Sequence, residues 1–171
     1  MKPLDNNHPH IIYRIAFIVL LALRFLTAHA GYQYTPNCER AMEELLSLRT
    51  TSARKVLSLE KAEHPDNHYA LYLENYCDVI DLLMLEDTSL YENFKYNYEA
   101  RREVMDGKDE DSPYYGLIES EMLFYMGVGH LKFGSKIQGA RKIYRAFKIL
   151  KKNVEEHPHF WLNEKWEGSY K

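Results

Sequence analysis

The chain has 171 residues and a formal net charge of −3, with 46% hydrophobic and 27% charged residues. A chain of this length can bury enough surface for one stable core, and this composition is too apolar for an intrinsically disordered protein. Residues 31–171 are more acidic than the whole chain, because residues 1–30 contain three basic residues and one acidic residue. This balance lacks the basic surface of nucleic-acid-binding proteins, so nucleic acid is not an expected partner.

The first residues have the layout of a secretory signal peptide. A polar start with Lys2 and Arg14 is followed by an uninterrupted apolar run over 15–23, which Arg24 ends. A membrane-spanning helix needs about 20 apolar residues, so this run favours a cleaved signal over a permanent anchor. An uncleaved signal that anchors the protein in the inner membrane is the alternative. A lipid-attachment site is not expected, because Cys38 lacks the small apolar residues that precede one.

A cleavage site follows the apolar run. Ala28 and Ala30 supply the small side chains that signal peptidase accepts, one on each side of a single residue. Cleavage after Ala30 leaves Gly31 as the new N-terminus. The sequence therefore predicts a signal peptide over 1–30 and an exported domain over 31–171. That domain is expected in the periplasm or secreted, with no membrane span after cleavage.

Helical periodicity dominates the remaining sequence, and no alternating strand pattern appears. The breakers between periodic segments predict six helices, over 37–48, 53–63, 69–85, 88–105, 114–133 and 137–156. The hydroxyls of Thr50, Thr51 and Ser52 are expected to cap the second helix. The last helix carries apolar residues at helical spacing, namely Ile137, Ala140, Tyr144, Phe147, Leu150 and Val154. Most of the 14 tyrosines also occur at helical spacing, which predicts that they pack between helices.

A repeat underlies these helices. Ala53, Ala100 and Ala146 lie 47 and 46 residues apart. Each is followed four residues later by an aliphatic residue (Leu57, Val104, Leu150) and 12 or 13 residues later by a proline (Pro65, Pro113, Pro158). Small residues let paired helices cross closely, and a proline ends the second helix of a pair. The pattern therefore predicts helical hairpins that stack on copies of themselves.

On this pattern the chain resembles the tetratricopeptide-like helical repeat proteins, over roughly residues 37–160. The alanine-to-proline spacing of 12 in two units matches the second half of that motif, and Gly127, Gly129 and Gly134 suit close contacts of its first helix. The period here is about 46 instead of about 34, and the tryptophan-leucine-glycine start is missing. The resemblance implies an all-α fold of antiparallel hairpins stacked as a short α/α superhelix, of the exported bacterial type. It implies a scaffold and no particular ligand.

The last repeat is incomplete in this sequence. Pro158 begins a further hairpin, and Trp161 and Trp166 follow it shortly before Lys171. We expect either a truncated version of a longer repeat protein or a stack that a partner completes. The two tryptophans are the predicted partner contacts, because aromatic side chains supply large contact area at low entropic cost.

Two cysteines offer a possible disulfide. Cys38 and Cys77 fall on the first and third predicted helices, which are neighbours in a hairpin stack. Export to an oxidising compartment makes a bond between them possible, and two separate buried thiols are the alternative.

Other chemically suggestive residues do not form recognisable sites. His64 and His68 flank Pro65, and His157 and His159 flank Pro158. The proline interrupts the helix between each pair, so no metal site is expected. The glycines near 127–129 lack the spacing and the preceding strand of a dinucleotide-binding loop, so no cofactor is expected. No catalytic motif is present, and the protein is not expected to be an enzyme.

The sequence thus predicts a non-catalytic scaffold that binds a protein segment or another envelope component. One alternative is a small-ligand-binding or enzymatic helical domain with a pocket between hairpins. Another is a fragment of a longer repeat protein with no independent role. A deep pocket with convergent polar groups would favour the ligand-binding alternative, and a shallow aromatic surface would favour the scaffold.

Overall fold

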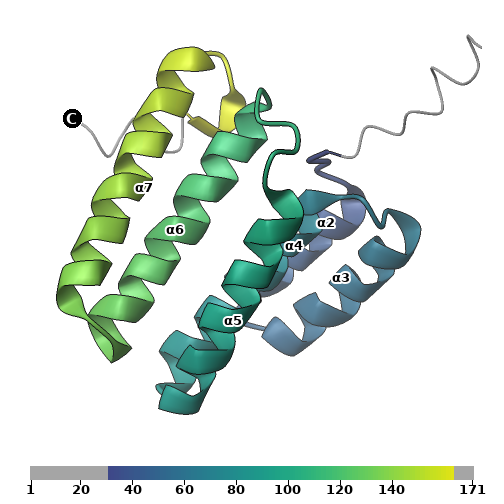
Figure 1. The fold of residues 1–171 in the computed structure, drawn as a ribbon. Coiled ribbons are helices and arrows are strands. Elements are labelled where there is room, and N and C mark those ends of the chain that lie inside the picture. Colours follow the sequence, from purple (N-terminus) through teal and green to yellow (C-terminus); the bar gives the residue numbers. More distant parts are fainter. Residues whose placement is uncertain (1–30, 164–171) are drawn as a thin grey trace, which may run out of the picture. The chain divides into compact units, whose positions relative to one another are not determined.

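The computed structural model describes residues 31–163 and shows an all-α domain (Figure 1). The helices are α2 (Pro36–Leu46), α3 (Thr50–Glu63), α4 (His68–Leu85), α5 (Thr88–Met105), α6 (Pro113–Phe133) and α7 (Lys136–Glu156), followed by the 3-10 turn η1 (Trp161–Asn163). The described residues belong to one compact unit. The predicted cleavage residues Ala28 and Ala30 and the predicted contact residue Trp166 lie outside the described residues.

Side-chain caps start five of these helices. Thr35, Asn67, Asp87, Ser112 and Ser135 each accept a hydrogen bond from a backbone N–H of the first turn that follows. Such caps satisfy amides that have no partner inside the helix.

The exception is α3, which begins at Thr50 after Arg49 and has no side-chain cap. The predicted hydroxyl cap at Thr50, Thr51 and Ser52 is therefore wrong. A tight turn brings the Arg49 amide back to the Glu44 carbonyl at 2.8 Å, so the chain enters the helix directly and the three hydroxyl residues already belong to it.

Consecutive helices pair as antiparallel hairpins, α2 with α3, α4 with α5 and α6 with α7 (Figure 1). The first helix of each later hairpin also packs on the hairpin before it: α4 contacts α2 and α3, and α6 contacts α4 and α5. The helix α7 stands at one end of this arrangement and packs mainly on α6 (Figure 1).

The core lies along α4, because this helix has neighbours on several sides. Its buried residues include Tyr69, Tyr72 and Leu73. Toward α6, the ring of Tyr76 stacks on Tyr125 with 5.3 Å between the ring centroids. Tyrosines thus pack between helices, as their spacing predicts.

Glycine sets the close approach of α6 and α7. A Cβ atom at Gly127 would lie 2.6 Å from Cγ1 of Ile143, and one at Gly139 would lie 2.8 Å from the Gly127 carbonyl oxygen. No side chain fits at these distances, so the two helices touch through their backbones. A Cβ at Gly129 would likewise lie 3.3 Å from the Tyr91 ring. The predicted close contacts at Gly127 and Gly129 are confirmed.

The alanine repeat holds in two of the three hairpins. Ala53 and Ala146 are buried, whereas Ala100 and Val104 are exposed. The predicted equivalence of Ala100 is therefore wrong. The helix α5 buries a different side, because burying the large residues Tyr91, Phe94, Tyr98 and Met105 removes more apolar surface from water than burying Ala100 would.

The apolar residues predicted on α7 are divided between two sides of the helix. The buried side consists of Gly139, Ala146, Leu150 and Asn153. Ile137 and Tyr144 are 67% and 62% exposed. The close approach to α6 requires glycine at residues 127 and 139, and Ile137 and Tyr144 lie roughly 140–160° around α7 from Gly139.

Candidate interaction surface and buried polar clusters

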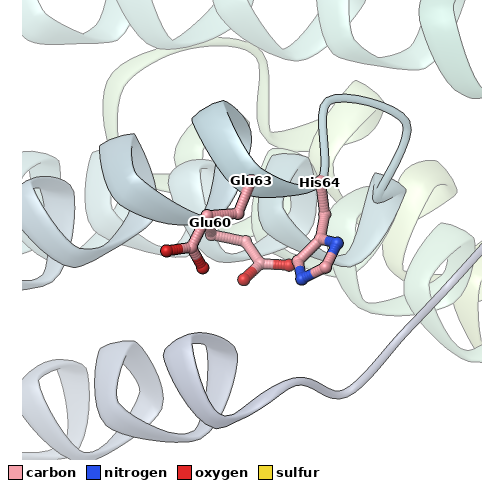
Figure 2. Close-up of side chains that lie close together, drawn as sticks. All are labelled: Glu60, Glu63 and His64. Carbon is pink, nitrogen blue, oxygen red and sulfur yellow. The ribbon is translucent and has the colours of Figure 1, made fainter.

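Three possible metal ligands meet at the end of α3. Glu60, Glu63 and His64 place a carboxylate oxygen or ring nitrogen within 4.8 Å of one another (Figure 2). Glu60 is fully buried, and the other two residues are exposed. The structure does not add His68 to this group, because His68 lies in the first turn of α4 with its ring against Tyr32, 5.5 Å between centroids.

Hydrogen bonds already engage the oxygens that a metal would need. Thr35 donates to one Glu60 oxygen at 2.7 Å, and Asn67 donates to the other at 2.6 Å. Asn37 donates to Glu63 at 2.8 Å. A metal would displace these donors, and a buried donor without a partner costs about 1–3 kcal/mol. We therefore interpret Glu60 as a polar tie between α3 and the N-caps of α2 and α4.

Asn67 extends this tie to the segment before α2. Its side chain accepts from the Gln33 amide at 3.0 Å and donates to the Gln33 carbonyl at 2.9 Å. It also accepts from the Tyr69 amide at 3.1 Å, which caps α4. Gly31, the predicted N-terminus after cleavage, accepts from the His68 amide at 3.2 Å. The Asn67 side chain thus ties the segment before α2 to the start of α4.

An ionic network joins α3, α4 and α5. Arg54 donates to Asp78 and to Asp81 at 2.8 Å each, and Arg101 donates to Asp78 at 2.7 Å. Burial alone would raise the pKa of Asp78, but Arg101, Arg54 and Asn97 outweigh it and hold the pKa below its usual value. Asp78 is therefore ionised and fully engaged, which indicates a structural role for the network.

A buried carboxylate lies between α4 and α6. Tyr72 donates its hydroxyl proton to Glu121, and the stacked rings of Tyr76 and Tyr125 lie beside the pair. Burial and the charge of Glu121 raise the pKa of Tyr72 far above its ordinary value, so the phenol stays protonated. The hydrogen bond from the Tyr72 hydroxyl to the Glu121 carboxylate therefore joins α4 to α6.

The cavity between α5 and α6 is small. It measures about 10 Å³, which is about the space of one water molecule. Its lining consists of Arg102, Met105, Asp106, Tyr115, Glu119 and Met122. Sites for small organic ligands measure roughly 300–1,000 Å³, so this cavity is too small for a substrate.

Both cysteines are free and buried in this structure. They lie on α2 and α4, which are in contact as the hairpin stack predicts. Burial raises the pKa of Cys38 and raises that of Cys77 to about 11, so both thiols are protonated at neutral pH. A Cys38–Cys77 disulfide stays a prediction for the oxidising compartment.

The last hairpin exposes a group of large apolar side chains. We define the terminal face as Phe124 and Leu131 of α6 with Ile137, Tyr144 and Phe147 of α7, all of which are exposed. Large apolar side chains that gather on one exposed surface can mark a binding site.

Contacts with α5 fix the side of the hairpin on which this face lies. On α7, Lys142 lies over the Tyr98 ring of α5 at 6.0 Å. At about 100° per residue, Tyr144 points roughly 160° away from Lys142. On α6, His130 hydrogen-bonds to Tyr91 of α5 at 2.7 Å, and Phe124 lies roughly 120° around the helix from His130. The terminal face therefore lies on the flank of the hairpin that turns away from α5.

The first hairpin shows what this flank corresponds to. The buried residues Ala53, Leu57 and Glu60 of α3 have the same spacing as Ala146, Leu150 and Asn153 of α7. Glu60 accepts from Thr35, the N-cap of α2, and Asn153 donates to the carbonyl of Pro113, the first residue of α6, at 3.0 Å. Both buried sides thus face the first helix of their own hairpin, and the two helices can be compared position by position.

In this register Phe147 corresponds to Arg54 and Tyr144 corresponds to Thr51. Arg54 lies on the side of α3 that α4 covers, where it bonds to Asp78. At the equivalent position α7 carries Phe147, whereas Thr51, the counterpart of Tyr144, is exposed in the first hairpin as Tyr144 is in the last.

The charge of α7 differs from that of the rest of the domain. This helix has seven Lys or Arg residues and two Glu residues, whereas residues 31–135 have 10 basic and 20 acidic residues. Arg141, Lys148 and Lys151 lie within about 60° of Tyr144 around the helix. The Lys148 ammonium lies 5.1 Å from the Tyr144 ring centroid. The terminal face thus has a basic border.

The predicted contact residue Trp161 lies elsewhere. Its ring is 55% exposed and packs edge-on against Tyr34, with 6.2 Å between centroids. The structure therefore puts Trp161 beside the segment that precedes α2. Sequence reasoning missed the terminal face because it assigned Ile137 and Tyr144 to one stripe with the buried residues. The strong basic bias of α7 was the available signal that much of this helix meets solvent.

Comparisons with protein-family models, with curated proteins and with solved structures give no match for this chain. Among the helices described between residues 31 and 163, none is both long enough and apolar enough to cross a bilayer.

Proposed function

We propose that this protein is an exported, non-enzymatic helical-repeat scaffold that binds a protein segment through the terminal face. The observation that carries the proposal is the exposure of Ile137 and Tyr144, two large apolar side chains on the basic helix α7. Burying each of these side chains in a complex would contribute about 1.5–3 kcal/mol to binding.

The remaining parts of the proposal rest on the sequence. The signal-like layout of residues 1–30 supports export to the periplasm or beyond, and an uncleaved inner-membrane anchor is its competitor. The contacts of α4 and α6 with the preceding hairpins support a tetratricopeptide-like stack.

The small-ligand alternative has less support. The buried carboxylates Glu60, Asp78 and Glu121 all have hydrogen-bond donors from the protein itself. The cavity of about 10 Å³ between α5 and α6 is smaller than a substrate needs, and the larger depression of about 270 Å³ on α5 is lined by charged residues alone, namely Glu99, Arg102, Glu103 and Asp106. The polar clusters are therefore best explained as ties between helices.

Site-specific photo-crosslinking in the native host tests the binding proposal. A photoreactive phenylalanine replaces Tyr144 in one strain and Tyr96 in another. Tyr96 is the matched control because it is a 75% exposed tyrosine on α5, outside the terminal face. We expect a discrete protein adduct at position 144 that is absent at position 96. Equal labelling at both positions, or none at 144, would refute binding through this face.

Intact mass of the protein recovered from the host envelope tests export. A chain that begins at Gly31 is expected. An uncut chain in the membrane fraction would indicate a membrane-anchored protein instead of an exported one.

A further inference from the structure

We propose that the outer side of α7 binds the surface of an anionic phospholipid membrane. We define the cationic stripe as four exposed residues of this helix, Arg141, Arg145, Lys148 and Lys152. The stripe adjoins the terminal face, and its occupant differs in kind from the protein segment of the proposed function. The membrane surface is therefore a second partner, bound through charge instead of apolar contact.

The four cations form a straight row. Their spacing of i, i+4, i+7 and i+11 places them within about 60° of one another around the helix. Their mean direction is roughly 140° from the buried side of α7, which packs on α6. Along the helix axis the row is about 16 Å long. The stripe thus points outward and can meet an extended anionic surface with all four charges at once.

The stripe also differs from the other basic residues of the domain in its lack of carboxylate partners. Within the described residues, no carboxylate lies within salt-bridge distance of Arg141, Arg145 or Lys148. Lys152 approaches Glu156 at 3.6 Å, with both side chains more than half exposed, so this pair is weak. By contrast, seven of the 10 basic residues over 31–135 pair with a carboxylate, namely Arg49, Arg54, Lys61, Lys95, Arg101, Arg102 and Lys132. An anionic partner of the stripe need not break a strong internal ion pair.

The acidic residues of the domain are concentrated elsewhere. The helix α7 has seven basic and two acidic residues, whereas residues 31–135 have 10 basic and 20 acidic residues. The helix α6 lies between α7 and the helices α2, α3 and α4 (Figure 1). A helix is about 10 Å wide, and exposed charges more than about 8 Å apart are largely screened at physiological salt. A membrane that touches the outer side of α7 is therefore attracted by the stripe and only weakly repelled by those helices.

Apolar side chains at the edge of the stripe favour a membrane over a nucleic acid. Ile137 and Tyr144 are 67% and 62% exposed and lie roughly 50–70° around α7 from the middle of the stripe. Helices that lie on a membrane surface combine a row of Lys and Arg with aliphatic and aromatic neighbours. Tyrosine suits the headgroup region because its ring is apolar and its hydroxyl is polar. The signal-like layout of residues 1–30 would also bring the domain to a membrane during export.

Co-sedimentation with vesicles of two compositions tests the proposal. One kind contains phosphatidylcholine alone, which has no net charge, and the other also contains the anionic lipid phosphatidylglycerol. We expect the protein recovered from the host envelope to bind the anionic vesicles more tightly. Raising the ionic strength from about 0.01 to about 0.15 M shortens the Debye length from about 30 to about 8 Å, so this binding should weaken. Equal binding to both kinds of vesicle would overturn the proposal.

Two paired variants assign the binding to the stripe. Arg145→Gln/Lys152→Gln removes two cations that do not border the terminal face. Each Lys or Arg near an anionic surface contributes about fivefold to binding, so this variant should bind at least about tenfold more weakly. Arg40→Gln/Lys55→Gln is the matched control, because it removes two exposed cations of α2 and α3 and changes the net charge equally. The control should bind as the natural protein does.

A circular dichroism melt shows that each variant is folded, and residues 1–30 are the same in all of them. Any difference in vesicle binding between the variants therefore arises in the domain. Equal weakening in the two pairs, or unchanged binding in Arg145→Gln/Lys152→Gln, would overturn the assignment to the stripe.

The same measurements separate the membrane from other outcomes. A protein adduct at position 144 without binding to anionic vesicles would refute the membrane surface and leave the proposed scaffold function intact. Vesicle binding without that adduct would refute binding of a protein segment and leave the membrane surface. Binding of polyglutamate that Arg145→Gln/Lys152→Gln abolishes, together with no vesicle binding, would indicate an acidic polypeptide in place of the membrane.

Discussion

The first and last hairpins share one design and differ in how they are held and covered. In α2–α3, polar side chains make the ties: Glu60 joins the caps at Thr35 and Asn67, and Asn37 reaches Glu63. In α6–α7, Gly127 and Gly139 bring the backbones together, and the buried polar residue equivalent to Glu60 is Asn153, with one hydrogen bond to Pro113.

The outer sides differ in the same way. The side of α3 that carries Arg54 and Lys61 is polar and bonds to α4. At the position of Arg54, α7 carries the apolar residue Phe147, which is 46% exposed. The comparison teaches that a repeat position specifies which side of a helix points to a neighbour, while the residues at that position decide what the neighbour must be.

The largest effect is expected at the polar tie of the first hairpin. Glu60→Ala removes the acceptor of the Thr35 hydroxyl and of one Asn67 N–H group, so we expect it to lower the free energy of unfolding by about 3 kcal/mol. Asn153→Ala, at the equivalent position, removes one neutral hydrogen bond and should cost about 1 kcal/mol. Urea unfolding followed by circular dichroism measures both. Equal losses of unfolding free energy in the two variants would show that the two hairpins do not differ in how strongly their polar residues hold them.

The glycine crossing of the last hairpin should give the next largest effect. A Cβ at residue 139 would lie 2.8 Å from both the Gly127 carbonyl oxygen and Cγ of Leu131. Alanine favours a helix by about 1 kcal/mol over glycine, but overpacking of this kind costs about 1–3 kcal/mol and needs a backbone shift. We expect Gly139→Ala to lower the melting temperature. Gln138→Ala, at the exposed neighbouring residue, serves as control. A rise in the melting temperature of Gly139→Ala would contradict the close backbone contact of α6 and α7 at this glycine.

Acid should act on the first part of the domain through His68. Burial lowers the pKa of His68, and Lys108 lowers it further. The unfolded chain takes up a proton near pH 6.5, whereas the folded chain takes it up at lower pH. The contribution of neutral His68 to the free energy of unfolding is therefore complete above about pH 6.5. It is lost as the pH falls through the pKa of His68 in the folded protein.

Urea midpoints at several pH values between 7 and 5 measure this effect. His68→Phe should flatten the decline relative to the natural chain. The exposed residue His64 provides the matched variant, His64→Gln, which should leave the decline as it is. An equally steep decline in His68→Phe would show that another group carries the acid sensitivity.

The smallest effect is expected on the terminal face. Tyr144 is 62% exposed, so Tyr144→Gln should change the free energy of unfolding by less than about 0.5 kcal/mol. The same variant should lose binding, because the ring would be buried only in a complex. Thermal melts of the two proteins, recorded alongside the binding assay, separate these outcomes. A large loss of stability would make Tyr144 part of the fold instead of part of a surface.

Much of the fold could be read from local patterns. Helical periodicity predicts all six helices close to their observed bounds, because the breakers at Pro65, Asp87, Pro113 and Gly134 act within the chain itself. The close contact at Gly127 follows from the same reasoning, since a missing side chain inside an apolar helix has few other uses. Local rules do not fix which side of a helix is buried when apolar residues cover a wide arc.

The terminal face could not be predicted from the sequence for that reason. Ile137 and Tyr144 look like core residues in the sequence, and Ala100 looks equivalent to Ala53 and Ala146. Their exposure depends on which neighbours the helices find, and the neighbour of α7 is decided by the crossing at Gly139.

The sequence by itself determined the all-α class, the helix boundaries and the signal-like layout of residues 1–30, because these depend on residues a few positions apart. Tertiary structure alone decided the rest. It brought Glu60 to Thr35 and Asn67, and it left Tyr144 facing solvent. Such contacts join residues that are distant in the sequence, and a helix has no preference for one side until another helix packs against it.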